Sequence, residues 1–485
     1  ALVMHPVLGQ LFSGLVELSA EMDVVPDVAQ SWEVLEGGRK YVFYLRNDVL
    51  WSDGTPVTAG DFEYAWKRVL APATEASYAE LLYDVKGARA FHRSRGGDPD
   101  SVGIQALDEV TLVVELDEPT GHFLYLLANS VCYPVPRRVV ERHGEAWTAT
   151  ENIVTNGPFK LETWQPGESM VLSRNLQYHG RFRGNVQQVE LSMLPHEEWP
   201  ARLAMYEADS LDTLDITFLP AAEMNSARQR HAGEYISVPT LTTWNVEFDT
   251  RRPPFDDPRV RRAFVLAIDK EMLVDVIMDS WALLGTGGFV PPGMPGHSAG
   301  IGLPYDPDQA RRLLAETGYP NGGNSGFPVV DLLMPSGPLA SAPCECLQAQ
   351  WQENLGVEIA WEEVKWVKLF DRLRKKPPHM MIMGWVADYP DPDNFLRAGF
   401  LWTQIRTGWQ DDVYDRLVEE ARKITDQEER MRLYRQADRI LIEETVIMPY
   451  CYERWHLLVK PWVKRFPLSA IGGVFWKDVI IEPHS

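Results

Sequence analysis

Apolar positions recur at helical spacing in several segments of the chain, and cap residues mark where those segments begin. The strongest such pattern, DDPRVRRAFVLAIDKEMLVDVIM, predicts one helix over residues 256–278. Asp257 occupies the N-cap position, and Pro258 occupies the first helical position, where its missing N–H costs nothing. The apolar stripe consists of Val260, Phe264, Ala267 and Ile268.

Three further segments carry helix signals. YDPDQARRLLAETGYP uses Asp306 and Pro307 to begin a helix and Gly318 to end it. Towards the C-terminal end, DDVYDRLVEEARKI and TDQEERMRLYRQADRILIEE predict a helical pair, with Thr425 and Glu428 as a capping box.

Alternating and continuous apolar runs predict strands between these helices. Tyr41 to Leu45 reads as a strand, residues 52–54 (Ser-Asp-Gly) as a turn, and Thr58 with Asp61 as the capping box of a following helix. On that helix, Phe62, Ala65, Trp66 and Val69 recur at helical spacing. DEVTLVVELDEP is a strand that stops at Pro119, and residues 380–387 form a buried strand. Helices and strands alternate without repeats, so the class is α/β or α+β, with domains woven from several segments.

Composition narrows the class of protein. At 485 residues and 55.2 kDa the chain is long enough for two or more domains. A formal net charge of -22 argues against a nucleic-acid or anionic-membrane partner, because binding to phosphates needs a positive field. The longest apolar runs fall short of the ~20 residues that span a bilayer. The first ten residues show no signal-peptide pattern.

Motifs for catalysis or metal binding are weak. The four cysteines, Cys132, Cys344, Cys346 and Cys451, lack zinc-site spacing and read as thiols with at most one bridge. Residues 285–293 (GTGGFVPPG) do not follow the dinucleotide-binding pattern, and HEEW at His196 lacks a second histidine. No phosphate loop or nucleophile elbow occurs. No cofactor or metal is therefore expected, although a peptide or glycan hydrolase stays open.

The stretch MMIMGWVADYPDPDNF, residues 380–395, carries a carboxylate to the end of the buried strand. Asp388 either caps a turn or binds a positive charge at a low-dielectric wall. Asp391 and Asp393 are expected to be turn and helix-cap residues. A metal site formed by the three aspartates is disfavoured by the two prolines and by the missing glycine and distal glutamate of a calcium loop.

Several segments resemble the family 5 extracellular solute-binding proteins, the oligopeptide and dipeptide receptors of ABC importers. The matching segments are LFSGLVEL, VPDVAQSWEVLEGGRKYVFYLRNDVLWSDGTPVTAGDFEYAWKRVL, IVTNGPFKLETWQPGESMVLSRN, NVEFDTRRPPFDDPRVRRAFVLAIDKEMLV, GWVADYPDPDNFL and DRLVEEARKITDQEERMRLYRQADRILIEETVIMPYCYE. They occur in the family's order over nearly the whole chain. The resemblance implies an extracytoplasmic receptor, periplasmic or lipid-anchored and monomeric. It would bind short peptides without catalysis and deliver them to membrane permease subunits. An oligosaccharide or a metal chelate is the alternative ligand on this fold.

The fold implied is α/β, a two-lobed hinged periplasmic-binding-protein-like fold (type II, cluster C-like) with an extra subdomain. The first lobe would comprise residues 1–42, 157–240 and 450–485, with 43–156 as its inserted subdomain. The second lobe would comprise 241–449. Strands near VPTLTTWNVEF and IMPYCYE would form the hinge, and a further strand would precede residue 1.

The resemblance also implies the ligand-binding residues. Asp388 would bind the α-ammonium of the ligand. The other expected contacts are Trp385, Val386, Ala387, Tyr389, Trp244, Asn245, Tyr78, Phe12, Ser13, Gly14 and Arg406. Strand alternation places Trp385 and Ala387 on one side and Val386 and Asp388 on the other, unless a bulge re-aims them. One branch of the family has an arginine where this chain has Ile382. A fixed anchor for a peptide carboxylate is therefore not expected, and Arg406 is the nearest replacement.

Overall fold

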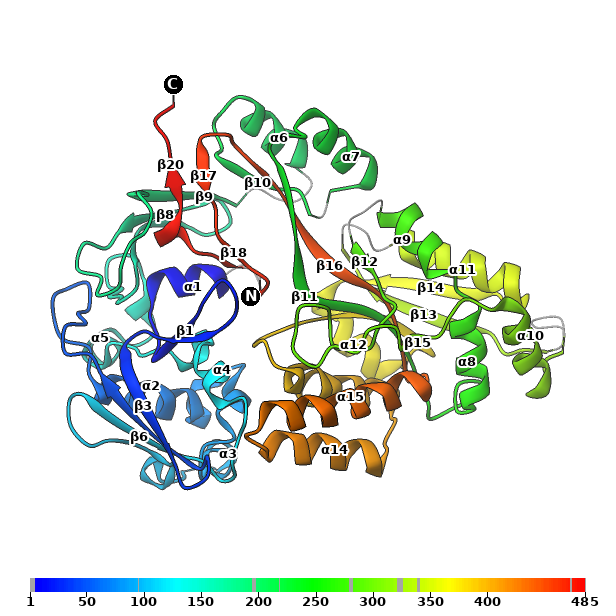
Figure 1. Cartoon of the computed structure of the whole chain (residues 1–485), viewed down its shortest axis with the longest axis horizontal. Coiled ribbons are helices and arrows are strands. Elements are labelled where there is room, and N and C mark those ends of the chain that lie inside the picture. The colour runs from blue at the N-terminus through cyan, green and yellow to red at the C-terminus, as the bar shows by residue number, and fades with distance from the viewer. Residues whose placement is uncertain are drawn as a thin grey trace. The chain divides into compact units, whose positions relative to one another are not determined.

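A computed structural model describes residues 5–94, 96–193, 198–217, 219–278, 282–320, 326–337, 341–471 and 473–484 (Figure 1). The chain forms two compact units, each built from separated segments. Unit 1 comprises residues 1–204, 422–427 and 461–485, and unit 2 comprises 205–421 and 428–460. Both units mix helices and strands, as the sequence pattern predicts.

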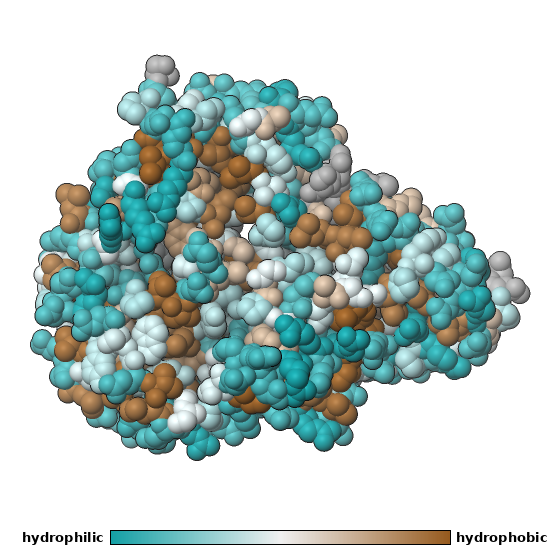
Figure 2. Space-filling model, viewed as in Figure 1, coloured by the Kyte–Doolittle hydropathy of each residue, from teal (hydrophilic) through white to brown (hydrophobic). Residues whose placement is uncertain are grey.

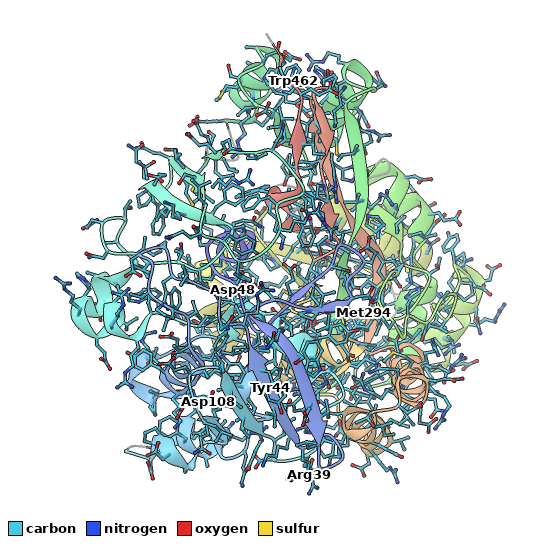
Figure 3. The ribbon with its side chains drawn as sticks, turned by 60° about the vertical axis from the view of Figure 1, so that its left-hand side comes forward. Arg39, Tyr44, Asp48, Asp108, Met294 and Trp462 are labelled. Carbon is cyan, nitrogen blue, oxygen red and sulfur yellow. The ribbon has the colours of Figure 1, made fainter. Side chains whose placement is uncertain are left out.

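Unit 1 contains two larger sheets and several short elements. Its helices are α1 (His5–Leu11), α2 (Ala59–Leu70), α3 (Ala88–Arg93), α4 (Phe123–Leu127) and α5 (Arg137–His143). Its strands are β1 (Val16–Leu18), β2 (Val24–Pro26), β3 (Ala29–Leu35), β4 (Lys40–Leu45), β5 (Ile104–Ala106), β6 (Thr111–Glu115), β7 (Phe159–Gln165), β8 (Ser169–Arg174), β9 (Gln188–Ser192), β17 (Val463–Arg465), β18 (Leu468–Ser469), β19 (Gly473–Val474) and β20 (Ile480–Ile481). The larger sheets have the orders β3-β4-β6-β5 and β7-β8-β9. Figure 3 shows the hairpin of β3 and β4, with Arg39 at its turn and Tyr44 on β4.

The predicted strand–turn–helix at residues 41–70 is confirmed. The Asp61 carboxylate accepts hydrogen bonds from the Thr58 N–H at 2.9 Å and the Thr58 hydroxyl at 3.1 Å, which fixes the start of α2. Phe62, Ala65 and Trp66 are buried against the unit's interior. The Trp66 indole N–H donates to the Cys132 carbonyl at 2.8 Å, so the buried ring keeps a polar partner.

Unit 2 is organised by one seven-stranded sheet. The strand order is β10-β16-β11-β15-β13-β14, and β12 also pairs with β16. These strands are β10 (Thr213–Asp215), β11 (Tyr235–Phe248), β12 (Ala282–Leu284), β13 (Val330–Pro335), β14 (Ile359–Val364), β15 (Met380–Val386) and β16 (Ile447–Val459). Its helices are α7 (Ala221–Arg230), α8 (Pro258–Leu266), α9 (Lys270–Met278), α10 (Pro307–Glu316), α11 (Ser341–Leu355), α12 (Trp366–Lys375), a π-helical turn (Asn394–Gly399), α13 (Phe400–Thr407), α14 (Asp412–Lys423) and α15 (Gln427–Glu443).

The chain passes between the units four times, the last time after Lys460, which follows β16. The boundaries at 204, 421 and 427 fall in α6 (Trp199–Glu207), in α14 and at the start of α15. The lobe boundaries predicted from the sequence lie at 240 and 449 instead. Residues 205–240 lie in unit 2, where β10 and the first part of β11 pair with β16.

The expectation of one helix over residues 256–278 is wrong. Asp257 and Pro258 begin α8 as predicted, with the Asp257 carboxylate accepting from the Arg259 N–H at 2.9 Å. The helix then stops, and the Asp269 carboxylate accepts from the Met272 N–H at 3.0 Å to begin α9. Two α11 side chains cause the break. Gln350 Oε1 accepts from the Asp269 N–H at 2.6 Å, and Asn354 Nδ2 donates to the Ala267 carbonyl at 2.8 Å.

The other predicted helices are confirmed. Asp306 begins α10, with its carboxylate accepting from the Gln309 N–H at 2.8 Å, and Gly318 adopts φ +97° just past its end. The C-terminal helical pair corresponds to α14 and α15, whose outward surface is largely hydrophilic in Figure 2. The capping box at Thr425 and Glu428 stays a prediction.

Candidate ligand-binding site

The end of β15 joins the centre of the unit 2 sheet. Ala387, the first residue beyond β15, donates its N–H to the Leu241 carbonyl of β11 at 2.9 Å. The register pairs Thr243 with Trp385 and Thr242 with Val386. Because neighbouring residues of a strand face opposite ways, Trp385 and Val386 lie on opposite faces of the sheet. Val386 is exposed, whereas Ala387 is buried.

Asn394 fixes both Trp385 and the Asp388 turn. Its side-chain oxygen accepts from the Trp385 indole N–H at 2.8 Å and from the Asp388 N–H at 3.2 Å. Its amide nitrogen donates to Asp388 Oδ2 at 3.1 Å. Gly399 leaves room for the Trp385 ring, since a Cβ at residue 399 would lie 2.6 Å from it. Asp388 is half-buried, and Asn394, which holds it in place, is fully buried. Asn394 lies six residues beyond Asp388, and the sequence pattern did not predict its role.

Asp391 is a turn residue, as predicted, and it is also half of a buried ion pair. Its Oδ1 accepts from the Asp393 N–H at 3.0 Å. Its two oxygens accept from Arg430 of α15 at 2.9 and 3.0 Å, and both side chains are buried. Burial by itself would lower the pKa of Arg430, but the Asp391 charge outweighs it and raises that pKa.

The expectation that Asp393 caps a helix is wrong. Its backbone is already helical and its side chain makes no capping hydrogen bond. The carboxylate instead accepts from the hydroxyls of Tyr389 at 2.7 Å and Tyr434 at 3.2 Å, and from Arg397 at 2.8 Å. Tyr389 is buried, and both burial and the Asp393 charge raise its pKa well above the usual value. This network makes the turn after β15 a rigid support for Asp388.

Trp244 and Asn245 are also fixed by the sheet. The Trp244 ring lies over Gly384, where a Cβ would come within 3.0 Å of it. Its indole N–H donates to Glu453 Oε2 of β16 at 3.0 Å. Asn245 is buried and donates to the Met383 carbonyl at 3.1 Å. Glu453 was not among the predicted residues, because no local motif marks it.

Arg406 lies in α13 and is paired within unit 2. Its guanidinium donates to the two carboxylate oxygens of Glu247 at 2.5 and 2.6 Å. Glu247 is buried in β11 and also accepts from the Thr403 hydroxyl at 3.0 Å. Arg406 thereby neutralises a buried carboxylate, which gives it a structural role. Ile382, where one family branch has arginine, is buried in β15.

The four expected contacts from the N-terminal part of the chain lie in unit 1. Phe12, Ser13 and Gly14 follow α1 and are buried. Asn156 brackets Ser13: its oxygen accepts from the Ser13 N–H and its nitrogen donates to the Ser13 carbonyl, both at 3.0 Å. A Cβ at Gly14 would lie 2.9 Å from Tyr133. Tyr78, in contrast, is exposed with 46% of its surface accessible.

Within the described part of the chain, the structure contains neither a metal-binding cluster nor a helix that could span a membrane. There, no group of three or more histidine, cysteine, aspartate or glutamate side chains is arranged to hold a metal ion. In the same ranges no helix combines the length and apolar character that a membrane span requires. All four cysteines are free thiols, and Cys132, Cys344 and Cys451 are buried.

The chain belongs to the bacterial extracellular solute-binding proteins, family 5, whose model matches residues 23–406. The predicted family and fold class are therefore confirmed. Among its relatives, a probable deoxycholate-binding periplasmic protein of Escherichia coli is 31% identical over 98% of this chain and 88% of its own length. The periplasmic oligopeptide-binding protein OppA of Salmonella typhimurium is 30% identical over the same shares of the two chains.

Solved structures agree with this assignment. Haemophilus influenzae OppA in complex with the peptide RPPGFSPFR is 27% identical, with a TM-score of 0.79 over 98% of this chain and 94% of that one. OppA of Burkholderia pseudomallei is 28% identical, with a TM-score of 0.81 over 100% and 95% of the two chains. The similarity therefore covers both compact units.

Proposed function

We propose that this protein is an extracytoplasmic receptor that binds short peptides and delivers them to the membrane permease subunits of an ABC importer. The names of several relatives, among them the oligopeptide-binding proteins OppA from Salmonella typhimurium and Haemophilus influenzae, support a peptide ligand. The proposed receptor acts as a monomer, without cofactor or catalysis.

The Asp388 carboxylate carries the proposal. It is half-buried at the exit of β15, and Asn394 holds both its side chain and its backbone N–H. A carboxylate fixed in this way can accept charge-assisted hydrogen bonds from an ammonium group without reorganising. The α-ammonium of a peptide is the proposed partner. The Asp391–Arg430 pair keeps the turn rigid while that group binds.

Contacts to the peptide backbone and side chains would come from residues around Asp388 and from unit 1. In unit 2 these are Trp385, Val386, Ala387, Tyr389, Trp244 and Asn245, and in unit 1 they are Phe12, Ser13, Gly14 and Tyr78. We omit Arg406 as an anchor for the peptide carboxylate because Glu247 already pairs with it. Without such an anchor, peptides of different lengths would be accepted.

An anionic ligand fits this site less well. The relative named for deoxycholate raises that alternative, because deoxycholate carries a carboxylate. Asp388 and Glu453 would repel a like charge in a half-buried setting. The same two groups favour a cationic ligand over a neutral oligosaccharide.

Native mass spectrometry of the purified protein tests the proposal. Added tri- to pentapeptides are expected to bind as intact, one-to-one complexes, and to be recovered uncleaved after long incubation. Retention of deoxycholate or hexose oligomers, with no peptide bound, would overturn the peptide assignment. Cleavage products that appear with time would show a hydrolase instead. Delivery is tested by the ATPase activity of the cognate transporter in vesicles, which peptide-loaded protein should stimulate.

A further inference from the structure

Glu453 is a half-buried carboxylate on the same face of the unit 2 sheet as Trp244. It lies in β16, between Ala282 of β12 and a bulge in β11. The bulge is wide: residues 240–242 of β11 lie opposite Glu453 alone, because the register moves from Pro239–Arg454 to Thr243–Tyr452. Bulges of this kind re-aim side chains and occur next to binding sites.

The same bulge is hydrogen-bonded to the residue that follows β15. Ala387 donates its N–H to the Leu241 carbonyl in the middle of the bulge. Glu453 and the Asp388 turn therefore flank one short segment of β11, from the two neighbouring strands. Strands lie about 4.8 Å apart, so the backbones that carry the two carboxylates are separated by roughly 10 Å. The exposed Val386 lies on the Trp244 face, because Gly384 pairs with Trp244 and two residues complete one strand repeat.

Glu453 has few partners for its charge. Within the described ranges, the Trp244 indole N–H is the single side-chain donor to its carboxylate, at 3.0 Å. An ionised carboxylate can accept about four hydrogen bonds. The adjacent cation, Arg454, is turned to the other face and donates to the Ser237 hydroxyl and carbonyl at 2.9 and 3.0 Å.

The surroundings of Glu453 destabilise its ionised carboxylate when no cation is bound. Burial raises the pKa of Glu453 to about 7, against the smaller lowering by the Trp244 N–H, and the negative charge of Asp215 on β10 raises it further. Ala282 and Trp244, the neighbours on β12 and β11, carry no charge to offset it. A cation beside Glu453 would relieve this cost.

We propose that Glu453 is a second anchor of the binding site, which selects peptides with a lysine or arginine side chain at one of the first two positions. This inference rests on the proposed function, in which Asp388 holds the α-ammonium. Each residue of an extended peptide advances about 3.3 Å. A long cationic side chain at position one or two therefore spans the distance from Asp388 to Glu453. Trp244 orients the carboxylate and offers its ring to the aliphatic stem of that side chain.

Calorimetric titration with matched peptides tests the inference. Lys-Ala-Ala-Ala and Ala-Lys-Ala-Ala are compared with the same peptides in which norleucine replaces lysine, so that the stem is kept and the charge removed. The wild type is expected to prefer lysine at least tenfold at one of the two positions. Glu453→Gln should lose this preference while it binds the norleucine peptide as well as the wild type. Glu353→Gln, which removes an exposed carboxylate of α11, should keep the preference.

A second readout separates direct pairing from an indirect effect. A cation lowers the pKa of Glu453, so at pH 7 the lysine peptide should displace about half a proton, because a group with a pKa of about 7 is half protonated there. Buffers with different ionisation enthalpies measure this release, and neither the norleucine peptide nor Glu453→Gln should show it. Peptide binding without a lysine preference, or a preference that persists in Glu453→Gln, would overturn this inference alone. Failure of every peptide to bind would overturn the proposed function as well.

Discussion

Arg430 and Asp391 form a bidentate ion pair in which both side chains are buried, although 39 residues separate them in the sequence. Asp391 belongs to the turn after β15 and Arg430 to α15, so the pair joins the site to the helix that supports it. We expect Asp391→Asn to lower the free energy of unfolding by roughly 3–5 kcal/mol, because it leaves the Arg430 charge buried without its partner.

The double variant Asp391→Asn with Arg430→Met should be more stable than Asp391→Asn alone, since it removes both charges. Denaturant unfolding measures all three proteins. The matched control is Glu429→Gln, which breaks an exposed pair with Arg432 and should cost less than about 1 kcal/mol. A loss of that small size in Asp391→Asn would show that the buried pair contributes little.

Asp388→Asn should weaken the binding of a peptide with a free α-amino group by about 30-fold or more, because loss of one partner of a desolvated charge pair costs roughly 2–5 kcal/mol. The amide preserves the shape of the turn, so the melting temperature should hardly change. Calorimetry with free and N-acetylated peptide on both proteins checks the assignment. Acetylation should harm binding to the wild type and have little further effect on the variant. Equal affinity of the wild type for the two peptides would rule out the ammonium anchor.

Asn394→Ala should affect both stability and binding. It removes the acceptor of the Trp385 indole N–H and the donor to Asp388. A buried donor left without a partner costs roughly 1–3 kcal/mol of stability. Affinity for a free-amine peptide should also fall, whereas affinity for the acetylated form should stay near its wild-type value. Asn152→Ala, which breaks an exposed hydrogen bond to the Ala146 carbonyl, serves as the control and should leave both measurements unchanged.

Asp438→Asn should make the protein more stable at alkaline pH. Asp438 is buried in α15, and although the Phe289 N–H donates to it at 2.7 Å, burial raises its pKa to about 7 from an ordinary value near 4. The folded state therefore holds a proton that the unfolded state releases. The stability that this proton supplies is present at low pH and is lost as pH rises from about 4 to about 7. Three pKa units set an upper bound of about 4 kcal/mol.

Unfolding of the wild type and Asp438→Asn, measured from pH 5 to pH 9, isolates this group, because the other titrating groups are common to both proteins. The stability advantage of the variant should grow between pH 5 and pH 7 and then level off. An advantage that does not change with pH would contradict the raised pKa.

Local signals made much of the fold predictable. Asp257 with Pro258, and Asp306 with Gly318, act through hydrogen bonds within a few residues, so their effect can be seen in the sequence. The break at Asp269 depends on Gln350, which lies 81 residues away, and it could not be predicted from the helical pattern.

In the candidate site, too, some residues could be predicted from local sequence, whereas others depend on partners that are distant in the chain. Asp388 stood out because a polar residue ends an apolar run. Glu453 lies in an apolar strand, and its meaning depends on the β11 bulge and on Trp244, which is 209 residues distant. Asp393 was expected to be a turn or helix-cap residue, but its carboxylate accepts hydrogen bonds from Tyr389, Tyr434 and Arg397, two of which are four residues away and one 41 residues away.

Unit 1 takes its last 25 residues, 461–485, from the end of the chain. Lys477 donates to Glu17 at 2.6 Å across 460 residues of sequence, and the Val479 carbonyl accepts from the Asn185 N–H at 3.1 Å. During synthesis, unit 1 begins to leave the ribosome first, but it cannot be completed until residues 461–485 have been made. A chain cut between residues 461 and 476 has the whole of unit 2 yet leaves Glu17 half-buried beside Asp27 without its cation. Unit 1 can therefore complete its core only after residues 461–485 have been made, so a chain that stops within this segment carries an incomplete unit 1.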